Sequence, residues 1–244
     1  MVKVTGLRLR HMAAMRVAAY ARRVAILKPR LVERFAADLR DLHDALEPTA
    51  IGGRYWVWSG LLLGWAREGA ILQHDSQDAD FAVLDSDFDR LVRSIPTILA
   101  AGFARDRCFV NNAGIVTELT FMRHGARFDF FRMFPEGDRR LRYFMYSIRW
   151  NGILEIEASL PEQDKVPFDF IGRSWLKHRD HELELRSMYG SWEIPDPSWS
   201  YLDGLDVESR RPSRHSHFDW WDDVELRMDG PRRSDTHTLG EPRH

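Results

Sequence analysis

Three aspartates carry the strongest chemical signal in this sequence. Asp78 and Asp80 flank a single alanine and stand at the entrance to the apolar run 81–84. Side chains two residues apart on a strand point to the same face, so both carboxylates can hold one hard divalent cation, Mg²⁺ or Mn²⁺. A solvated acidic loop is the alternative, and the apolar run directly behind the pair counts against it.

The third aspartate, Asp129, lies inside the apolar sequence Phe128–Phe131. A carboxylate in such a strand is costly to bury unless a metal, an arginine or a proton compensates its charge. It is therefore either one half of a structural ion pair, or a third metal ligand or general base. A third acid on a strand next to a two-acid site is the arrangement that metal-assisted phosphoryl transfer needs.

A candidate phosphate-binding turn precedes these acids. Ser59 and Gly60 follow the aromatic and β-branched run 55–58 and come directly before the apolar stretch 61–67. This pattern predicts a strand that leads straight into a helix. Glycine lets the backbone approach a phosphate closely, and a helix N-terminus favours negative charge.

The elements that must position these residues can be read from the hydrophobic periodicity. Apolar residues at three- and four-residue steps predict a helix over 31–46, and similar spacing predicts another over 87–101. The pattern predicts strands over 55–58 and 80–84, hairpins 117–122/127–134 and 142–150/153–158, a strand over 168–171 and a helix over 177–189. The fold class is therefore α+β, with a mixed sheet flanked by helices.

Composition limits the remaining possibilities. The 244 residues carry a net charge of −2, which gives no general preference for nucleic acid, and the single cysteine, Cys108, excludes an internal disulfide. We expect a helical extension over 1–30, a catalytic domain over 31–203 and a mobile polar tail over 204–244. The first 32 residues lack Asp and Glu, so the extension is basic. It either packs on the domain or lies on an anionic membrane surface. We expect a cytoplasmic protein, either free or peripheral to the inner face of the membrane.

Four segments, taken together, resemble the LicD/fukutin family. The run from Ser59 to Gly69 is similar to the family's opening motif, roughly Gly-Thr-Leu-Leu-Gly-x-x-Arg-x-Gly. The segments Asp78–Phe81 and Phe128–Phe131 look like its Asp-hydrophobic-Asp-hydrophobic motif and its later single-acid strand. The closing pattern of Tyr-Gly, Trp, Pro and Trp is matched by Tyr189, Gly190, Trp192, Pro195 and Trp199.

This resemblance implies a nucleotidyltransferase-like fold and a specific type of reaction. Family members transfer a phosphocholine or phospho-alditol group from a CDP-activated donor (choline, ribitol or glycerol type) to a hydroxyl of a glycan or glycolipid. Carried over to this chain, the resemblance makes Asp78 and Asp80 metal ligands and Asp129 the third ligand or the base. Ser59 and Gly60 would lie against the donor phosphates, and Arg67 would orient the acidic loop or the donor. The loop before Asp78 departs from the family pattern, and Asp75 is an alternative ligand there.

Two other functions fit the same residues. One is a nucleotidyltransferase that uses ATP or CTP, attacks at the α-phosphorus and releases pyrophosphate. The other is a binding protein that kept the fold and lost the reaction, which the altered loop before Asp78 would explain.

Overall fold

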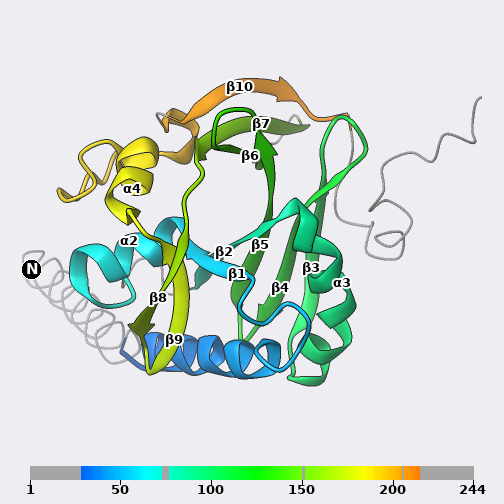
Figure 1. Ribbon diagram of the computed structural model, residues 1–244, viewed down its shortest axis with the longest axis vertical. Coiled ribbons are helices and arrows are strands. Elements are labelled where there is room, and N and C mark those ends of the chain that lie inside the picture. The colour runs from blue at the N-terminus through cyan, green and yellow to red at the C-terminus, as the bar shows by residue number, and fades with distance from the viewer. Residues whose placement is uncertain (1–28, 73–76, 150–151, 205, 215–244) are drawn as a thin grey trace, which may run out of the picture.

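The computed structural model describes residues 29–72, 77–149, 152–204 and 206–214. Within them, a mixed β-sheet is flanked by helices, which confirms the predicted α+β class (Figure 1). The extension predicted for residues 1–30 lies almost wholly outside the described residues. Asp75 and the part of the predicted tail beyond residue 214 also lie outside them.

The sheet is built around one long strand, β5 (Ala126–Glu136). Its first part pairs in parallel with β2 (Asp78–Leu84) on one side and antiparallel with β4 (Val116–Arg123) on the other. The strand β1 (Tyr55–Trp58) extends the sheet beyond β2, and β3 (Ala104–Val110) extends it beyond β4. These five strands therefore run in the order β1-β2-β5-β4-β3.

The end of β5 continues into a second group of antiparallel strands. It pairs with β6 (Arg140–Arg149), which pairs with β7 (Gly152–Pro161). The strand β10 (Val207–Pro212) pairs with the other edge of β7, so the stretch 207–212, predicted as mobile tail, is part of the sheet. Its polar sequence conceals this role because β10 is an edge strand with mostly exposed side chains.

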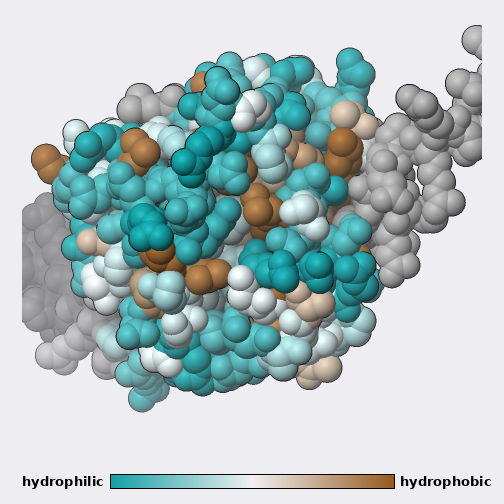
Figure 2. All heavy atoms as spheres, viewed as in Figure 1, coloured by the Kyte–Doolittle hydropathy of each residue, from teal (hydrophilic) through white to brown (hydrophobic). Residues whose placement is uncertain are grey.

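Helices cover one face of the five-strand part and complete the core. The helix over residues 29–46 buries Phe35, Leu39, Leu42 and Leu46, as its periodicity predicted. It shares a core with α3 (Asp85–Ala100) and with residues of α2 (Ser59–Glu68). A second core lies on the opposite face of the sheet and includes Trp56 and Trp58, together with residues of β6 and β7. The face shown in Figure 2 is mostly hydrophilic, with separate hydrophobic spots.

The predicted helix 177–189 is wrong in its first part. Residues 173–178 form β9 (Arg173–His178), which pairs antiparallel with β8 (Lys165–Phe170), and α4 begins only at His181 (His181–Tyr189). Strand pairing buries Trp175, and the side chain of Asp180 accepts a hydrogen bond from the backbone N–H of Leu183 at 3.0 Å. This N-cap fixes the start of the helix. The strand β3 was also missed, because charged residues fill its first half.

Candidate metal centre

The turn from β1 into α2 contains Ser59 and Gly60, which are the first two residues of the helix. Ser59 has a φ of 51°, in the left-handed region that residues with a side chain rarely adopt. Its hydroxyl lies 3.1 Å from the hydroxyl of Tyr189, the last residue of α4. Strained residues of this kind persist where the surrounding structure holds them, and they cluster at functional sites.

A buried pair of side chains fixes α4 in the position from which Tyr189 reaches this turn. Glu184 on α4 and His178 at the end of β9 are both fully buried, and Nδ1 of the histidine lies 2.6 Å from a carboxylate oxygen of the glutamate. The His178 ring in turn packs on Trp56 of β1, with 5.1 Å between ring centroids. The strand β1, which leads into the turn, is thus connected through His178 to the helix α4.

Strand register brings the three predicted aspartates together. Trp58, the residue before the turn, is opposite Asp80, and Asp80 is the parallel partner of Asp129. Asp78 lies one pleat earlier on the same face. One carboxylate oxygen from each of Asp78, Asp80 and Asp129 lies within 4.8 Å of the other two.

Asp129 is the most unusual of the three carboxylates. It is only 8% exposed, and its Oδ1 has no hydrogen-bond partner among the described residues. Burial, and then the negative charge of Asp78, raise its pKa from 3.8 to about 7, although a hydrogen bond from the Thr120 hydroxyl acts in the opposite direction. A structural ion pair was the predicted alternative for Asp129, but no side chain among the described residues pairs with its Oδ1.

Glu118 is a fourth acid near the site that the sequence interpretation missed. It lies on β4, two residues from Thr120, which is the register partner of Asp129. The Thr120 hydroxyl oxygen lies 3.4 Å from Glu118 Oε1. Burial and the charges of Asp129, Asp80 and Asp78 raise the pKa of Glu118 well above its ordinary value. The sequence contained a pattern that indicates this position: Glu118 and Thr120 alternate with buried Leu119 and Phe121 and therefore form a polar face of the strand.

The other predicted site residues lie along α2. Gly60 is the second residue of that helix and adjoins Ser59, so both are at its N-terminal end. Arg67 is in the last turn, about two turns away, and its Nε lies 3.8 Å from Glu68 Oε1. Contacts of Ser59, Gly60 and Arg67 with a donor remain predictions.

The residues present fit a divalent cation. They offer only carboxylate oxygens, the ligands that hard cations prefer, and three such groups this close together repel one another without a cation or a proton. The unpartnered Oδ1 of Asp129 supplies an acceptor that a cation would satisfy. A magnesium or manganese ion is therefore chemically suited to this position.

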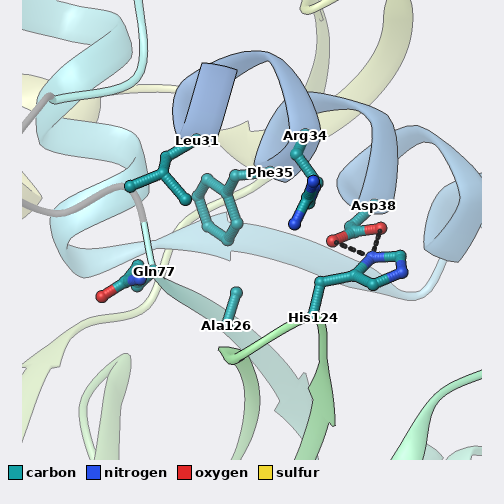
Figure 3. A pocket seen from close by; sticks show the side chains of 7 residues that line it. All are labelled: Leu31, Arg34, Phe35, Asp38, Gln77, His124 and Ala126. Atoms are coloured by element: carbon teal, nitrogen blue, oxygen red, sulfur yellow. Dashed lines mark hydrogen bonds and ion pairs between the residues drawn. The ribbon is translucent and has the colours of Figure 1, made fainter. Parts of the chain in front are cut away.

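A small pocket beside the start of β2 has a structural role. It has a volume of about 10 Å³, room for about one water, and is lined by Leu31, Arg34, Phe35, Asp38, Gln77, His124 and Ala126 (Figure 3). His124 Nδ1 lies 2.9 and 3.1 Å from the two carboxylate oxygens of buried Asp38. The backbone N–H of Arg127 donates to the Gln77 carbonyl at 2.8 Å. These contacts tie the β4–β5 turn to the helix over 29–46 and the start of β5 to β2, and so hold Asp129 in register with Asp80.

Comparison with known families agrees with this geometry. Residues 52–170, from just before β1 to the end of β8, match the family model LicD/FKTN/FKRP, nucleotidyltransferase domain. Residues 52–170 belong to the LicD family. The matched LicD domain contains all three aspartates and the turn at Ser59. Membership supports a transferase with phosphotransferase-type activity on glycans.

A search of curated proteins gave no match. Among the residues that the structure describes, no helix has the length and apolar character needed to cross a membrane.

Proposed function

We propose that the LicD domain transfers a phosphocholine or phospho-alditol group from a CDP-activated donor to a hydroxyl of a glycan or glycolipid. Asp78, Asp80 and Asp129 would hold Mg²⁺ or Mn²⁺ for this reaction. The observation that supports the proposal most directly is the close approach of these three carboxylates, together with the buried and unpartnered Oδ1 of Asp129.

The bound ion would offset the negative charge of the donor's diphosphate group. The backbone N–H groups at the start of α2, at Ser59 and Gly60, have the position and polarity to hold a phosphate. The acceptor hydroxyl attacks the β-phosphorus, the bond from that phosphorus to the bridging oxygen breaks, and CMP leaves with the electron pair. The hydroxyl proton passes to a carboxylate oxygen of the cluster that the ion does not occupy, on Asp129 or on a neighbouring acid.

The decisive experiment measures CMP release from CDP-choline, CDP-ribitol and CDP-glycerol with Mn²⁺ and glycan acceptors. Wild type should release CMP with at least one donor, and Asp80→Asn should be slower by about a hundredfold or more, since loss of the ion removes several kcal/mol of charge stabilisation. Asp89→Asn, an exposed aspartate on α3, is the matched control and should behave as wild type.

Two other outcomes would assign a different function. Release of pyrophosphate from ATP or CTP, with no CMP from any CDP-linked donor, would make the domain a nucleotidyltransferase. Metal-dependent nucleotide binding without turnover of any donor would make it a binding protein that retains the fold.

A further inference from the structure

A β-bulge in β3 places two consecutive side chains on the side of the sheet that carries the acids. Arg105 is opposite Phe121 and Arg107 is opposite Thr120, so Asp106 is an extra residue without a register partner. In a regular strand, Asp106 and Arg107 would point to opposite faces. The bulge removes this alternation, because bulges re-aim side chains and are frequent beside active sites.

Asp106 joins two arginines at the rim of the acidic cluster. Arg127 donates from Nε to Asp106 Oδ2 at 2.7 Å, and Arg107 Nε lies 3.6 Å from the same oxygen. Arg127 is on β5, two residues before Asp129 and therefore on the same face, and is the register partner of Asp78.

The second arginine, Arg107, is in strand register with the cluster. Arg107, Thr120, Asp129 and Asp80 form one row across β3, β4, β5 and β2. Arg107 is therefore two strands from Asp129, about 10 Å between backbones, which an arginine side chain can largely span. Its charge acts against the rise in the pKa of Asp129. The Arg107 and Arg127 side chains are 25% and 41% exposed, so solvent and ligands can reach both.

We propose that Arg107 and Arg127, held in place by Asp106, bind phosphate oxygens of the CDP-activated donor next to the aspartate cluster. This inference rests on the proposed function. Two guanidinium groups share one carboxylate, which leaves one positive charge for an anion.

The electrostatics of the cluster explain why such cations are needed. Three ionised aspartates and a single divalent ion have a net negative charge, which would repel a diphosphate. Guanidinium groups at the rim offset this repulsion and bind phosphate in a directed, bidentate geometry. Neither the Asp-X-Asp motif nor the turn at Ser59 supplies such a group.

The test uses Arg107→Gln, with CDP and Mn²⁺ as probes. Calorimetry should show CDP binding in saturating Mn²⁺ weakened about ten- to hundredfold, the value of a charged hydrogen-bonded contact. Binding of Mn²⁺ alone, followed by electron paramagnetic resonance, should be unchanged or tighter, because a cation near the acids has been removed. The CDP affinity of Arg107→Lys should lie between those of wild type and Arg107→Gln, since lysine keeps the positive charge but loses the bidentate hydrogen-bonding geometry of the guanidinium group.

The control is Arg105→Gln, on the same strand but opposite Phe121 on the other face of the sheet, and it should bind CDP as wild type does. Equal CDP affinity in wild type and Arg107→Gln would overturn this inference while leaving the proposed function intact. Loss of Mn²⁺ and CDP binding together in Arg107→Gln would also overturn it, since that pattern indicates a structural role. If wild type with Mn²⁺ binds no CDP, the proposed function itself fails.

Discussion

Replacing Asp129 with asparagine should stabilise the metal-free protein at neutral pH while abolishing metal binding. An aspartate in the unfolded chain ionises near pH 3.8, whereas burial and Asp78 raise the pKa of folded Asp129 to about 7. Between these values the folded state holds a proton that the unfolded state has lost, so stability falls as the pH rises through this window. Only above about pH 7 is the carboxylate ionised in the folded state, so only there does its burial lower stability by the full amount.

The size of the effect follows from the shift in pKa. About three pKa units at 1.36 kcal/mol each give a loss of about 4 kcal/mol above pH 7. This is an upper limit, since local relaxation and water entry reduce the cost of a buried charge. The asparagine of the Asp129→Asn variant cannot ionise, so the variant escapes the loss. For a domain of this size, each kcal/mol changes Tm by about 2–4 °C, so the variant should melt several degrees higher than wild type at pH 8 in EDTA.

The assay is thermal and urea unfolding from pH 4 to pH 8, with EDTA and with Mn²⁺. The advantage of Asp129→Asn should be smallest near pH 4 and grow up to about pH 7. Saturating Mn²⁺ should stabilise wild type alone, by about 2.7 kcal/mol at a hundred times Kd, and so reduce or reverse the difference. Asp89→Asn should follow wild type throughout. A variant less stable than wild type at pH 8 in EDTA, or a difference independent of pH, would refute the reasoning.

Three further substitutions test other parts of the site. Glu118→Gln should leave Mn²⁺ affinity within about threefold by calorimetry, because burial raises the pKa of Glu118 and so favours its neutral form, which glutamine resembles. A tenfold loss would show that Glu118 is a ligand. Glu184→Ala should lower the free energy of unfolding in urea by about 3–5 kcal/mol, because it leaves His178 buried without its partner. The control Glu182→Ala, at an exposed glutamate on the same helix, should lower it by under about 0.5 kcal/mol. Equal losses in the two variants would contradict a structural role for the pair. Tyr189→Phe removes the hydroxyl contact with Ser59 and should reduce kcat/KM for CMP release about three- to tenfold, with Tm within about 3 °C of wild type; unaltered kinetics would show that the contact does not position the turn.

Local sequence patterns determined most of the individual elements. The steps between Phe35, Leu39 and Leu42 predicted the helix over 31–46, and the pattern over 117–122 and 127–134 predicted the β4–β5 hairpin. These predictions succeed because a helix repeats every 3.6 residues and a strand every two, so burial of one face appears directly in the sequence. The same alternation placed Asp78 and Asp80 on one face of β2.

Strand partners and registers were decided by the tertiary structure. The sequence suggested that Asp129 joins Asp78 and Asp80 but did not specify the strand pairing that brings them together. In the structure, β2 pairs in parallel with β5 and so sets Asp129 beside Asp80, although α3, β3 and β4 separate the two strands along the chain. The strands β9 and β10 were missed for the same reason, since their hydrogen-bond partners and packing, rather than their own periodicity, make them strands.

The electrostatic character of the site also required the fold. The sequence marked Asp129 as a carboxylate that needs a compensating charge or proton, but the rise in its pKa comes from burial and Asp78 in the folded chain. Glu118 becomes part of the site only because β4 pairs with β5, and Arg107 only because the bulge turns it toward the acids. The amino-acid sequence determines which groups can ionise, whereas the distances between them and their removal from water, which set their energies, are properties of the packed chain.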